Sequence, residues 1–365
     1  MNKRILMAVY GPIQTDARVI RSAKGLYEMG CDVELISWNS IDNYESPYFK
    51  SINFKIKKGA FSLFIFWYKV YRYIMKNKKD IDLVYFHDYY MPYLGKLVGK
   101  CLHKKWVYDA HELLVYKKGA KVSLREKIFC YLEKKSISKA SLVIAANYER
   151  MRIIEHVYKL KNCTYVQNIS DVSIAKASQS IEKENIIVYQ GVLGKSRNVE
   201  FYVKMHQFLP DNFKLLLIGD GAARNELLEQ AKELGIEDRV EFTGKVSQKE
   251  LYEKSHLSKI GIVTYTMQGL NNYYCAPNKV FEYATLGIPM IGTPQPFLKS
   301  MFKKYKVGEI VKWDDKEGYM KAVNKIMENY DQYLKGMSML LEENNSKNET
   351  ERLQKYISEL LIYRH

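Results

Sequence analysis

The sequence has few of the features that mark secreted, metal-binding or membrane-spanning proteins. Its five cysteines stand singly, with neither a CxxC pair nor the spacing of metal ligands: Cys31, Cys101, Cys130, Cys163 and Cys275. The start, "MNKRILMAVYG", has no small-residue cleavage site, so it indicates a first β-strand rather than a signal peptide. Residues 61–75 form the most apolar stretch, but Lys69 and Arg72 interrupt it, and a bilayer span needs about 20 apolar residues. These absences predict a cytoplasmic protein without a membrane span.

Acidic residues are also scarce, at 41 against 57 lysines and arginines, which gives a formal charge of +16. Such a charge predicts a polyanionic partner, and nucleic acid, an anionic lipid surface and phosphorylated small molecules all qualify. No nucleic-acid recognition motif accompanies the basic residues, so nucleic acid is not a predicted partner.

One segment, Lys50 to Lys79, holds nine basic residues and no acidic one, interleaved with "FSLFIFWYKVYRYIM". If residues 61–79 are helical, Lys69, Arg72, Lys76 and Lys79 are three or four positions apart and form one basic stripe. This pattern predicts peripheral binding to an anionic membrane surface. In the alternative interpretation, the aromatic side packs on a sheet and the stripe is merely solvated.

The 365 residues are too many for one ordinary core and suit two domains. Short apolar runs alternate with amphipathic segments throughout, as in parallel α/β proteins. Polar residues 170–185 resemble a linker, and Leu353, Ile357, Leu360 and Leu361 have the spacing of a packed terminal helix. We therefore predict two doubly wound, Rossmann-like domains, residues 1–182 and 183–341, and a C-terminal helix within residues 342–365 that packs back on the body.

In open parallel sheets, ligands bind beyond the carboxyl ends of the strands, which directs attention to residues that follow each apolar run. In the first half these are Gly11 to Arg18, His87 with Asp88, and Asp109 to Glu112. In the second half they are Gly191 to Arg197, Gly219 to Gly221, and Tyr273 to Glu282. We expect all of them to face one cleft.

The segment "CAPNKVFEYATLGIPMIGT", Cys275 to Thr293, carries the strongest pattern. Pro277 suits the first position of a helix, where free N–H groups and Lys279 favour a diphosphate. Glu282, one turn later, can accept two hydrogen bonds from a ribose diol. The alternative is that Lys279 and Glu282 are an ordinary surface pair.

A second pattern is the glycine loop "YQGVLGKSRNVE". Gly191 and Gly194 permit close backbone approach, and Arg197 can bind phosphate oxygens with both arms of its guanidinium.

These motifs, together with "TDARVIRSAKGLYEMGCDVELIS", "YDAHEL" and the block Leu215 to Ile291, resemble the retaining glycosyltransferases of family 4, the group 1 transferases, with the GT-B double-Rossmann fold. The resemblance implies that the second domain binds a nucleotide-sugar donor, with a UDP-sugar favoured, and that the first binds a glycan or lipid-linked acceptor for cell-surface polysaccharide or glycoconjugate synthesis. It also implies reaction with retention and without a cofactor.

Carried over by residue, the resemblance assigns Arg197 to the diphosphate, Glu282 to the ribose and His111 to the donor sugar. The expected catalytic residues are His111, Arg197 and Lys279. The expected donor-binding residues are Gly11, Gly191, Arg197, Gly219, Asn278, Lys279 and Glu282. The expected acceptor-binding residues are Arg18, His87 and Asp88.

No metal site is expected, because the DxD pair Asp80 and Asp82 precedes its strand, at the edge opposite the predicted ligand. Tyr274 and Val192 replace a glutamate and an arginine that many family members carry. Two other interpretations stay open: a nucleotide-sugar epimerase on the same fold, and a catalytically silent transferase-like partner subunit.

Overall fold

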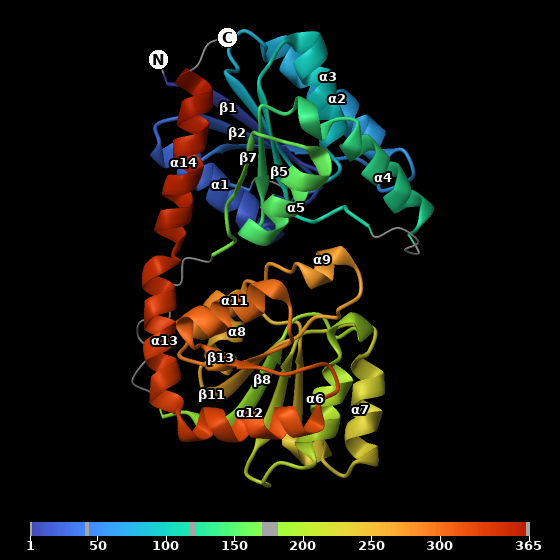
Figure 1. Cartoon of the computed structure of the whole chain (residues 1–365). Helices are drawn as coiled ribbons and strands as arrows, with labels where there is room; N and C mark the ends of the chain where they lie inside the picture. The colour runs from blue at the N-terminus through green and yellow to red at the C-terminus, as the bar shows by residue number, and fades with distance from the viewer. Residues whose placement is uncertain (1, 41–43, 117–121, 170–181, 363–365) are drawn as a thin grey trace. The chain divides into compact units, whose positions relative to one another are not determined.

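The computed structural model describes residues 2–40, 44–116, 122–169 and 182–362. The chain forms two compact units, residues 1–168 with 346–365 (unit 1) and residues 169–345 (unit 2) (Figure 1). Each unit contains one parallel sheet with helices, which confirms the predicted α/β fold class. Most of the predicted linker, residues 170–185, lies outside the described residues.

The described part of unit 1 has a seven-stranded parallel sheet in the order β3-β2-β1-β4-β5-β6-β7. The order reverses between β1 and β4, as in Rossmann-like sheets. Most strands are apolar runs buried along most of their length, because helices cover both faces of such a sheet. The strands are β1 (Arg4–Val9), β2 (Asp32–Trp38), β3 (Lys50–Phe54), β4 (Leu83–His87), β5 (Trp106–Ala110), β6 (Leu142–Ala145) and β7 (Cys163–Tyr165). Its helices are α1 (Ala17–Glu28), α2 (Ser62–Asn77), α3 (Pro92–Leu102), α4 (Leu124–Lys134), α5 (Tyr148–Tyr158) and α14 (Ser346–Ile362).

The described part of unit 2 repeats this plan with six parallel strands in the order β10-β9-β8-β11-β12-β13. Its strands are β8 (Glu184–Gln190), β9 (Lys214–Ile218), β10 (Val240–Gly244), β11 (Ser258–Val263), β12 (Met290–Gly292) and β13 (Gly308–Ile310). Its helices are α6 (Val199–His206), α7 (Arg224–Glu233), α8 (Gln248–Ser255), α9 (Leu270–Tyr273), α10 (Lys279–Thr285), α11 (Pro296–Tyr305), α12 (Lys316–Glu328) and α13 (Tyr330–Glu343).

The C-terminal helix α14 belongs to unit 1, where it lies beside α1 (Figure 1). Leu353 and Ile357 are buried in the same core cluster as β1 and α1. The Gln354 side chain donates a 2.8 Å hydrogen bond to the Gly25 carbonyl, and the Thr350 methyl lies directly over Gly25, where a larger residue would collide. The chain therefore returns to its first domain after completing the second.

Two details of the fold differ from the sequence-based expectations. The strands were expected to be apolar runs, but the edge strand β3 has none: it pairs only with β2, and its five residues are mostly half-buried. Helix α10 begins at Lys279, with Asn278 at the N-cap, so Pro277 precedes the helix instead of occupying its first position. The prediction for Pro277 is therefore wrong by two positions.

We expect Leu353→Ala to lower the free energy of unfolding by about 2–5 kcal/mol, because truncating a fully buried leucine leaves a cavity. Leu353 is 2% exposed, whereas Ile362 on the same helix is 73% exposed. Ile362→Ala is the matched control and should change stability by less than about 0.5 kcal/mol. Chemical denaturation measures both, and equal effects would show that α14 is not part of the unit 1 core.

Candidate active site

In unit 1, the carboxyl ends of β1, β4 and β5 lie next to one another in the sheet, at the point where its strand order reverses. Gly11 follows β1, His87 ends β4 and is followed by Asp88, and Asp109 lies in β5 two residues before His111. A side chain added at Gly11 would meet no atom within 4 Å. This edge is the place where a Rossmann-like sheet binds its ligand.

A buried ion pair between Arg18 and Asp109 lies beneath this edge. The Arg18 guanidinium donates to Asp109 from Nη2 at 2.6 Å and from Nε at 3.0 Å, and the Tyr85 hydroxyl donates to the second carboxylate oxygen at 3.0 Å. Burial by itself would raise the pKa of Asp109, but the positive charge of Arg18, a hydrogen bond from His87 and smaller contributions of His111 together outweigh it and hold that pKa well below its usual range. Asp109 is therefore ionised at neutral pH.

His111 lies at the exposed side of this network. Its Nε2 is 3.2 Å from His87 Nδ1, which in turn lies 3.4 Å from the Asp109 carboxylate. Arg150 donates a 2.8 Å hydrogen bond to the His111 carbonyl and so helps to hold the backbone there. Burial lowers the pKa of His111 to about 4, although Asp109 opposes the shift. With this pKa, His111 is a neutral imidazole at pH 7. Its side chain is 17% exposed, so a ligand can reach it.

The residues expected to bind an acceptor differ in their access to solvent. Arg18 is 7% exposed and His87 is fully buried, so little of the first side chain and none of the second is open to solvent. Their polar groups are directed at Asp109 and His111 instead. Acceptor contact by Arg18 and His87 stays a prediction, and the structure adds a positioning role for both in the network of Asp109 and His111.

Asp88, by contrast, is only half-buried. Its backbone is left-handed, with φ of 66°, and its carboxylate accepts a 2.7 Å hydrogen bond from the Tyr89 N–H. Burial, with smaller contributions from Glu112 and Asp16, raises the pKa of Asp88 to about 7. Asp88 therefore remains the reachable member of the predicted acceptor set.

One group of ligand-type side chains among the described residues comes close enough to suggest a metal site, namely His87, Asp109 and His111, whose ligand atoms lie within 4.8 Å of one another. Arg18 places a positive charge 2.6 Å from the Asp109 carboxylate, and Tyr85 takes its other oxygen. This arrangement suits a hydrogen-bond network better than a divalent cation. The DxD residue Asp82 is likewise engaged, by Lys3 at 2.9 Å and by the Arg4 N–H.

In unit 2, the loops after β8 and β9 pack backbone to backbone through two glycines. Gly191 and Gly219 have φ of 130° and 137°, and a side chain at Gly219 would come within 2.0 Å of the Gly191 carbonyl oxygen. The Gly191 N–H donates to the Ile218 carbonyl at 2.8 Å. Glycine is required at Gly219 by this close approach, which fixes the position of the loop that carries Arg197.

Two cations converge beside this loop. The Lys279 ammonium lies 4.4 Å from the centre of the Tyr189 ring and 5.8 Å from that of Tyr265, and the Arg197 guanidinium lies 4.3 Å from Tyr265. Burial, together with the charge of Arg197, lowers the pKa of Lys279 to about 7. Two partly desolvated cations at strand ends form a strong site for an anion.

Glu282 lies one turn after Lys279, on α10, and the Gln190 side chain donates a hydrogen bond to its carboxylate. Asn278, the N-cap of α10, is half-buried at the start of the same helix. Unit 2 therefore brings Gly191, Arg197, Lys279 and Glu282 to one edge of its sheet. Because α10 has only seven residues, the two cations and not the helix dipole dominate the local field.

Three residues at this edge were not predicted: Gln190, Tyr265 and Asn272. Gln190 ends the apolar strand β8 and is 3% exposed, and Tyr265 follows β11. Asn272 accepts a 3.2 Å hydrogen bond from Arg197. A glutamine at the end of an apolar run, directly before a glycine loop, is the one signal in the sequence that could have indicated Gln190. The contacts of Tyr265 and Asn272 arise from the tertiary fold.

Comparison with known families covers both units. The family described as "Glycosyltransferase Family 4" matches residues 17–173, and that described as "Glycosyl transferases group 1" matches residues 170–344. The chain belongs to the group 1 glycosyltransferases. Its membership confirms the predicted family, and the strand orders of both units agree with the GT-B fold.

Relatives of this group 1 glycosyltransferase include an alpha-1,4-N-acetyl-D-galactosaminyltransferase of Campylobacter jejuni, named for a PP-undecaprenol-linked substrate, which is 36% identical over 28% of each chain. An uncharacterized glycosyltransferase of Methanocaldococcus jannaschii is 24% identical over 62% of this chain and 58% of its own. The matched segments thus span less than two thirds of these relatives.

Solved structures of similar fold extend over the whole group 1 glycosyltransferase. Anabaena HepE, crystallised with UDP, has a TM-score of 0.71 and 14% identity, and covers 98% of this chain and 100% of its own. Sucrose-phosphate synthase from Thermosynechococcus elongatus has a TM-score of 0.73 and 16% identity, over 99% of this chain and 97% of its own. At such identity these likenesses show the fold.

We expect Gly219→Ala to destabilise unit 2 by at least about 2 kcal/mol, because the new methyl group meets the Gly191 carbonyl and the backbone is in a conformation that alanine rarely adopts. Gly11→Ala is the matched control, since its methyl group enters open space and should leave the melting temperature unchanged. Thermal denaturation compares the two. A stable Gly219→Ala protein would show that the two loops do not pack as described.

Proposed function

We propose that this group 1 glycosyltransferase transfers a sugar from a nucleotide-sugar, with retention and without a metal, to a glycan or lipid-linked acceptor in cell-surface polysaccharide or glycoconjugate synthesis. The observation that carries the donor assignment is the convergence of Arg197 and Lys279 beside the Gly191 loop. Both cations rest on aromatic rings, and among the described residues neither has a carboxylate oxygen within 4.0 Å. Their charges are therefore available to a diphosphate.

The remaining unit 2 residues fit the other parts of a nucleotide-sugar. In this proposal Glu282, held by Gln190, accepts the hydroxyls of the ribose, and Asn278 lies near the phosphates and the sugar. HepE has been solved with UDP and with UDP-glucose, which supports a UDP-sugar as the donor. In this proposal the backbone at Gly11, Gly191 and Gly219 also contacts the donor, and Gly219 must be glycine because a side chain there would meet the Gly191 carbonyl oxygen.

The reaction forms a bond between the acceptor oxygen and the anomeric carbon and breaks the bond from that carbon to the diphosphate oxygen. Arg197 and Lys279 stabilise the charge that develops on the departing diphosphate, a contribution of about 3 kcal/mol per donor in comparable sites. The departing oxygen itself takes the acceptor proton, so no side chain is assigned as general base. His111, neutral and held by His87, contacts the sugar through a hydrogen bond.

Unit 1 carries features that support a membrane-proximal acceptor. On α2, Leu63, Phe66, Trp67, Val70 and Ile74 are buried, whereas Lys69, Arg72, Lys76 and, just beyond the helix, Lys79 are exposed. Exposed basic residues contribute about 1 kcal/mol each near an anionic leaflet. No helix in the described ranges has both the length and the apolar character needed to span a bilayer. We propose peripheral attachment to the inner face of the cytoplasmic membrane.

The two other interpretations make different predictions for the same site. An epimerase would convert the donor sugar without any acceptor, and a silent partner subunit would bind donor without transfer or hydrolysis. Val192, which replaces a common arginine, has an exposed side chain, and its carbonyl accepts a 2.8 Å hydrogen bond from Tyr189. The loop is thus intact at this substitution, which favours an active transferase. Product analysis with and without acceptor separates the three.

We predict that the affinity for UDP falls as the pH rises from 7 to 9. The pKa of Lys279 is about 7, so above this pH the free protein loses the ammonium charge, and binding the diphosphate anion must restore it. The loss should reach at most about tenfold per pH unit, with proton uptake on binding visible in calorimetry. Lys279→Gln should bind UDP weakly and without this pH dependence.

Lys195→Gln is the matched control, because Lys195 lies in the same loop but is 84% exposed. It should bind UDP as the wild type does at every pH. Equal behaviour of the Lys279 and Lys195 variants would place the diphosphate elsewhere.

We also predict that sugar transfer survives an excess of EDTA, because two fixed cations take the place of a divalent metal at the diphosphate. A transfer assay with and without chelator measures this directly. Full loss of turnover on chelation, restored by magnesium or manganese, would contradict the metal-free proposal.

A further inference from the structure

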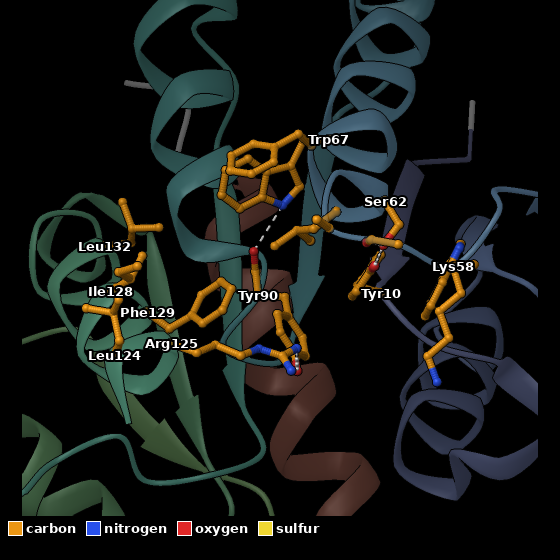
Figure 2. Close-up of a pocket in the computed structure, with 15 residues that line it drawn as sticks. Tyr10, Lys58, Ser62, Trp67, Tyr90, Leu124, Arg125, Ile128, Phe129 and Leu132 are labelled. Carbon is orange, nitrogen blue, oxygen red and sulfur yellow. Dashed lines mark hydrogen bonds between the residues drawn. The ribbon is translucent and has the colours of Figure 1, made fainter. Parts of the chain in front are cut away.

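A pocket of about 830 Å³ lies within unit 1, at the same sheet edge as the His111 network. Tyr10 directly follows β1, Trp38 ends β2 and Tyr90 follows β4. We call these three lining residues the floor of the pocket. Helices α2 and α4 form its two sides (Figure 2). Since ligands of such sheets bind beyond the carboxyl ends of the strands, the pocket adjoins the region expected to receive the acceptor.

The floor of the pocket is a rigid aromatic cluster. The Tyr10 ring stacks on Trp38 at 4.4 Å with 7° between the planes, and the edge of Tyr90 meets Tyr10 at 5.2 Å. The Trp67 indole donates a 3.0 Å hydrogen bond to the Tyr90 carbonyl, and the Tyr10 hydroxyl lies 2.6 Å from the Ser62 hydroxyl (Figure 2). These bonds pair the polar atoms of Trp67, Tyr10 and Ser62, so most of the surface that faces the pocket is apolar.

The sides of the pocket are apolar and reach solvent. Phe64 on α2 is 59% exposed, and Leu124 and Ile128 on α4 are 75% and 49% exposed. Proteins rarely leave such side chains in water around a hollow unless something apolar covers them. A polar sugar would leave these apolar side chains exposed to water, whereas a hydrocarbon chain would cover them.

Charge at the pocket is of one sign. Lys58 and Arg125 line it, and Figure 2 shows Lys58 on the side of the pocket opposite the three labelled aliphatic residues of α4. The Arg125 guanidinium donates a 2.9 Å hydrogen bond to the Tyr90 hydroxyl and lies 5.6 Å from the centre of that ring, which orients it beside the pocket. Glu126, the acidic neighbour on α4, is turned back to cap Ser123. A phosphate group therefore meets cations next to an apolar hollow.

We propose that this pocket binds the hydrocarbon chain of a lipid phosphate acceptor, with Arg125 and Lys58 at the phosphate. The proposal rests on the proposed function, because it names the apolar part of that acceptor. It also separates two uses of α2: the basic stripe faces a lipid surface, and Phe64 and Trp67 face one lipid molecule. The hydrocarbon chain of the acceptor, withdrawn from the bilayer, would thus be held at the sheet edge where the acceptor reacts.

Alkyl phosphates provide the test, with the full chain and without any donor. Trp38 and Trp67 line the pocket, so their fluorescence reports its occupation. Dodecyl phosphate, kept below its micelle concentration, should change the emission saturably, and inorganic phosphate at equal concentration should not. From octyl to dodecyl phosphate, each buried methylene should tighten binding by up to about fourfold. Affinity independent of chain length would overturn the proposal.

Paired variants separate the pocket from general adsorption to apolar surface. Phe64→Ser and Ile128→Ser should each weaken dodecyl phosphate binding by about fivefold or more, because each removes part of a wall. Ile65→Ser and Tyr131→Ser are the controls, since both residues lie on the same helices, are 44% and 60% exposed, and do not line the pocket. All four positions are exposed, so the variants should fold, which circular dichroism checks. Equal weakening by all four would assign the binding to a membrane-like surface and sink the pocket.

Arg125→Gln tests the phosphate part. Wild type should prefer dodecyl phosphate to dodecanol, and the variant should bind both alike; an unchanged preference would remove Arg125 from the proposal. UDP titration of the same samples keeps the two hypotheses distinct. If the wild type binds alkyl phosphate but not UDP, the donor site is contradicted and the pocket stands. If it binds UDP but not alkyl phosphate, the pocket is contradicted and the donor site stands.

Discussion

The ion pair between Arg18 and Asp109 is the interaction on which the candidate site of unit 1 depends. Arg18 comes from α1, Asp109 from β5 and Tyr85 from β4, and Arg18 also donates a 2.8 Å hydrogen bond to the carbonyl of Val166. Segments from much of the unit thus meet at one buried charge pair. Removing either partner would leave an uncompensated charge in the core, a loss of about 3–5 kcal/mol in other proteins. Such a pair tolerates little movement of the strands that carry His87 and His111.

The two units solve opposite electrostatic problems with buried groups. Unit 1 confines an ion pair below a histidine, so that His111 reaches the surface as a neutral hydrogen-bonding group. Unit 2 leaves Arg197 and Lys279 on aromatic rings, where burial lowers the pKa of Lys279 to about 7 and an anion would restore its charge. A neutral contact suits a sugar hydroxyl and a paired cation site suits a diphosphate. The two units thus offer a ligand groups of different chemistry.

The surface of α2 shows how one helix can serve both core and periphery. Phe66, Val70 and Ile74 pack inward, which explains the apolar content of the segment without any membrane. Phe61, Phe64 and Tyr68 nevertheless stay exposed, at 73%, 59% and 63%. The packing of the inward face agrees with the alternative interpretation, in which the aromatic side of this segment packs on a sheet. The exposed aromatic residues are more than such packing requires. That surplus of exposed apolar surface is the feature on which the proposed lipid partner rests.

The α/β fold class with two parallel sheets followed from the sequence alone, because buried parallel strands read as apolar runs and glycine or proline marks their ends. Strand β3 was not predicted, because this edge strand pairs on one side only and has no such apolar run. The sequence also marked Arg197, Lys279 and Glu282, but only the tertiary structure showed that Gln190 and Tyr265 hold them. Likewise Arg18 and His87 looked like ligand contacts, and the structure buries them. Position along a strand predicts which edge a residue reaches, whereas burial and partner depend on side chains brought from elsewhere in the chain.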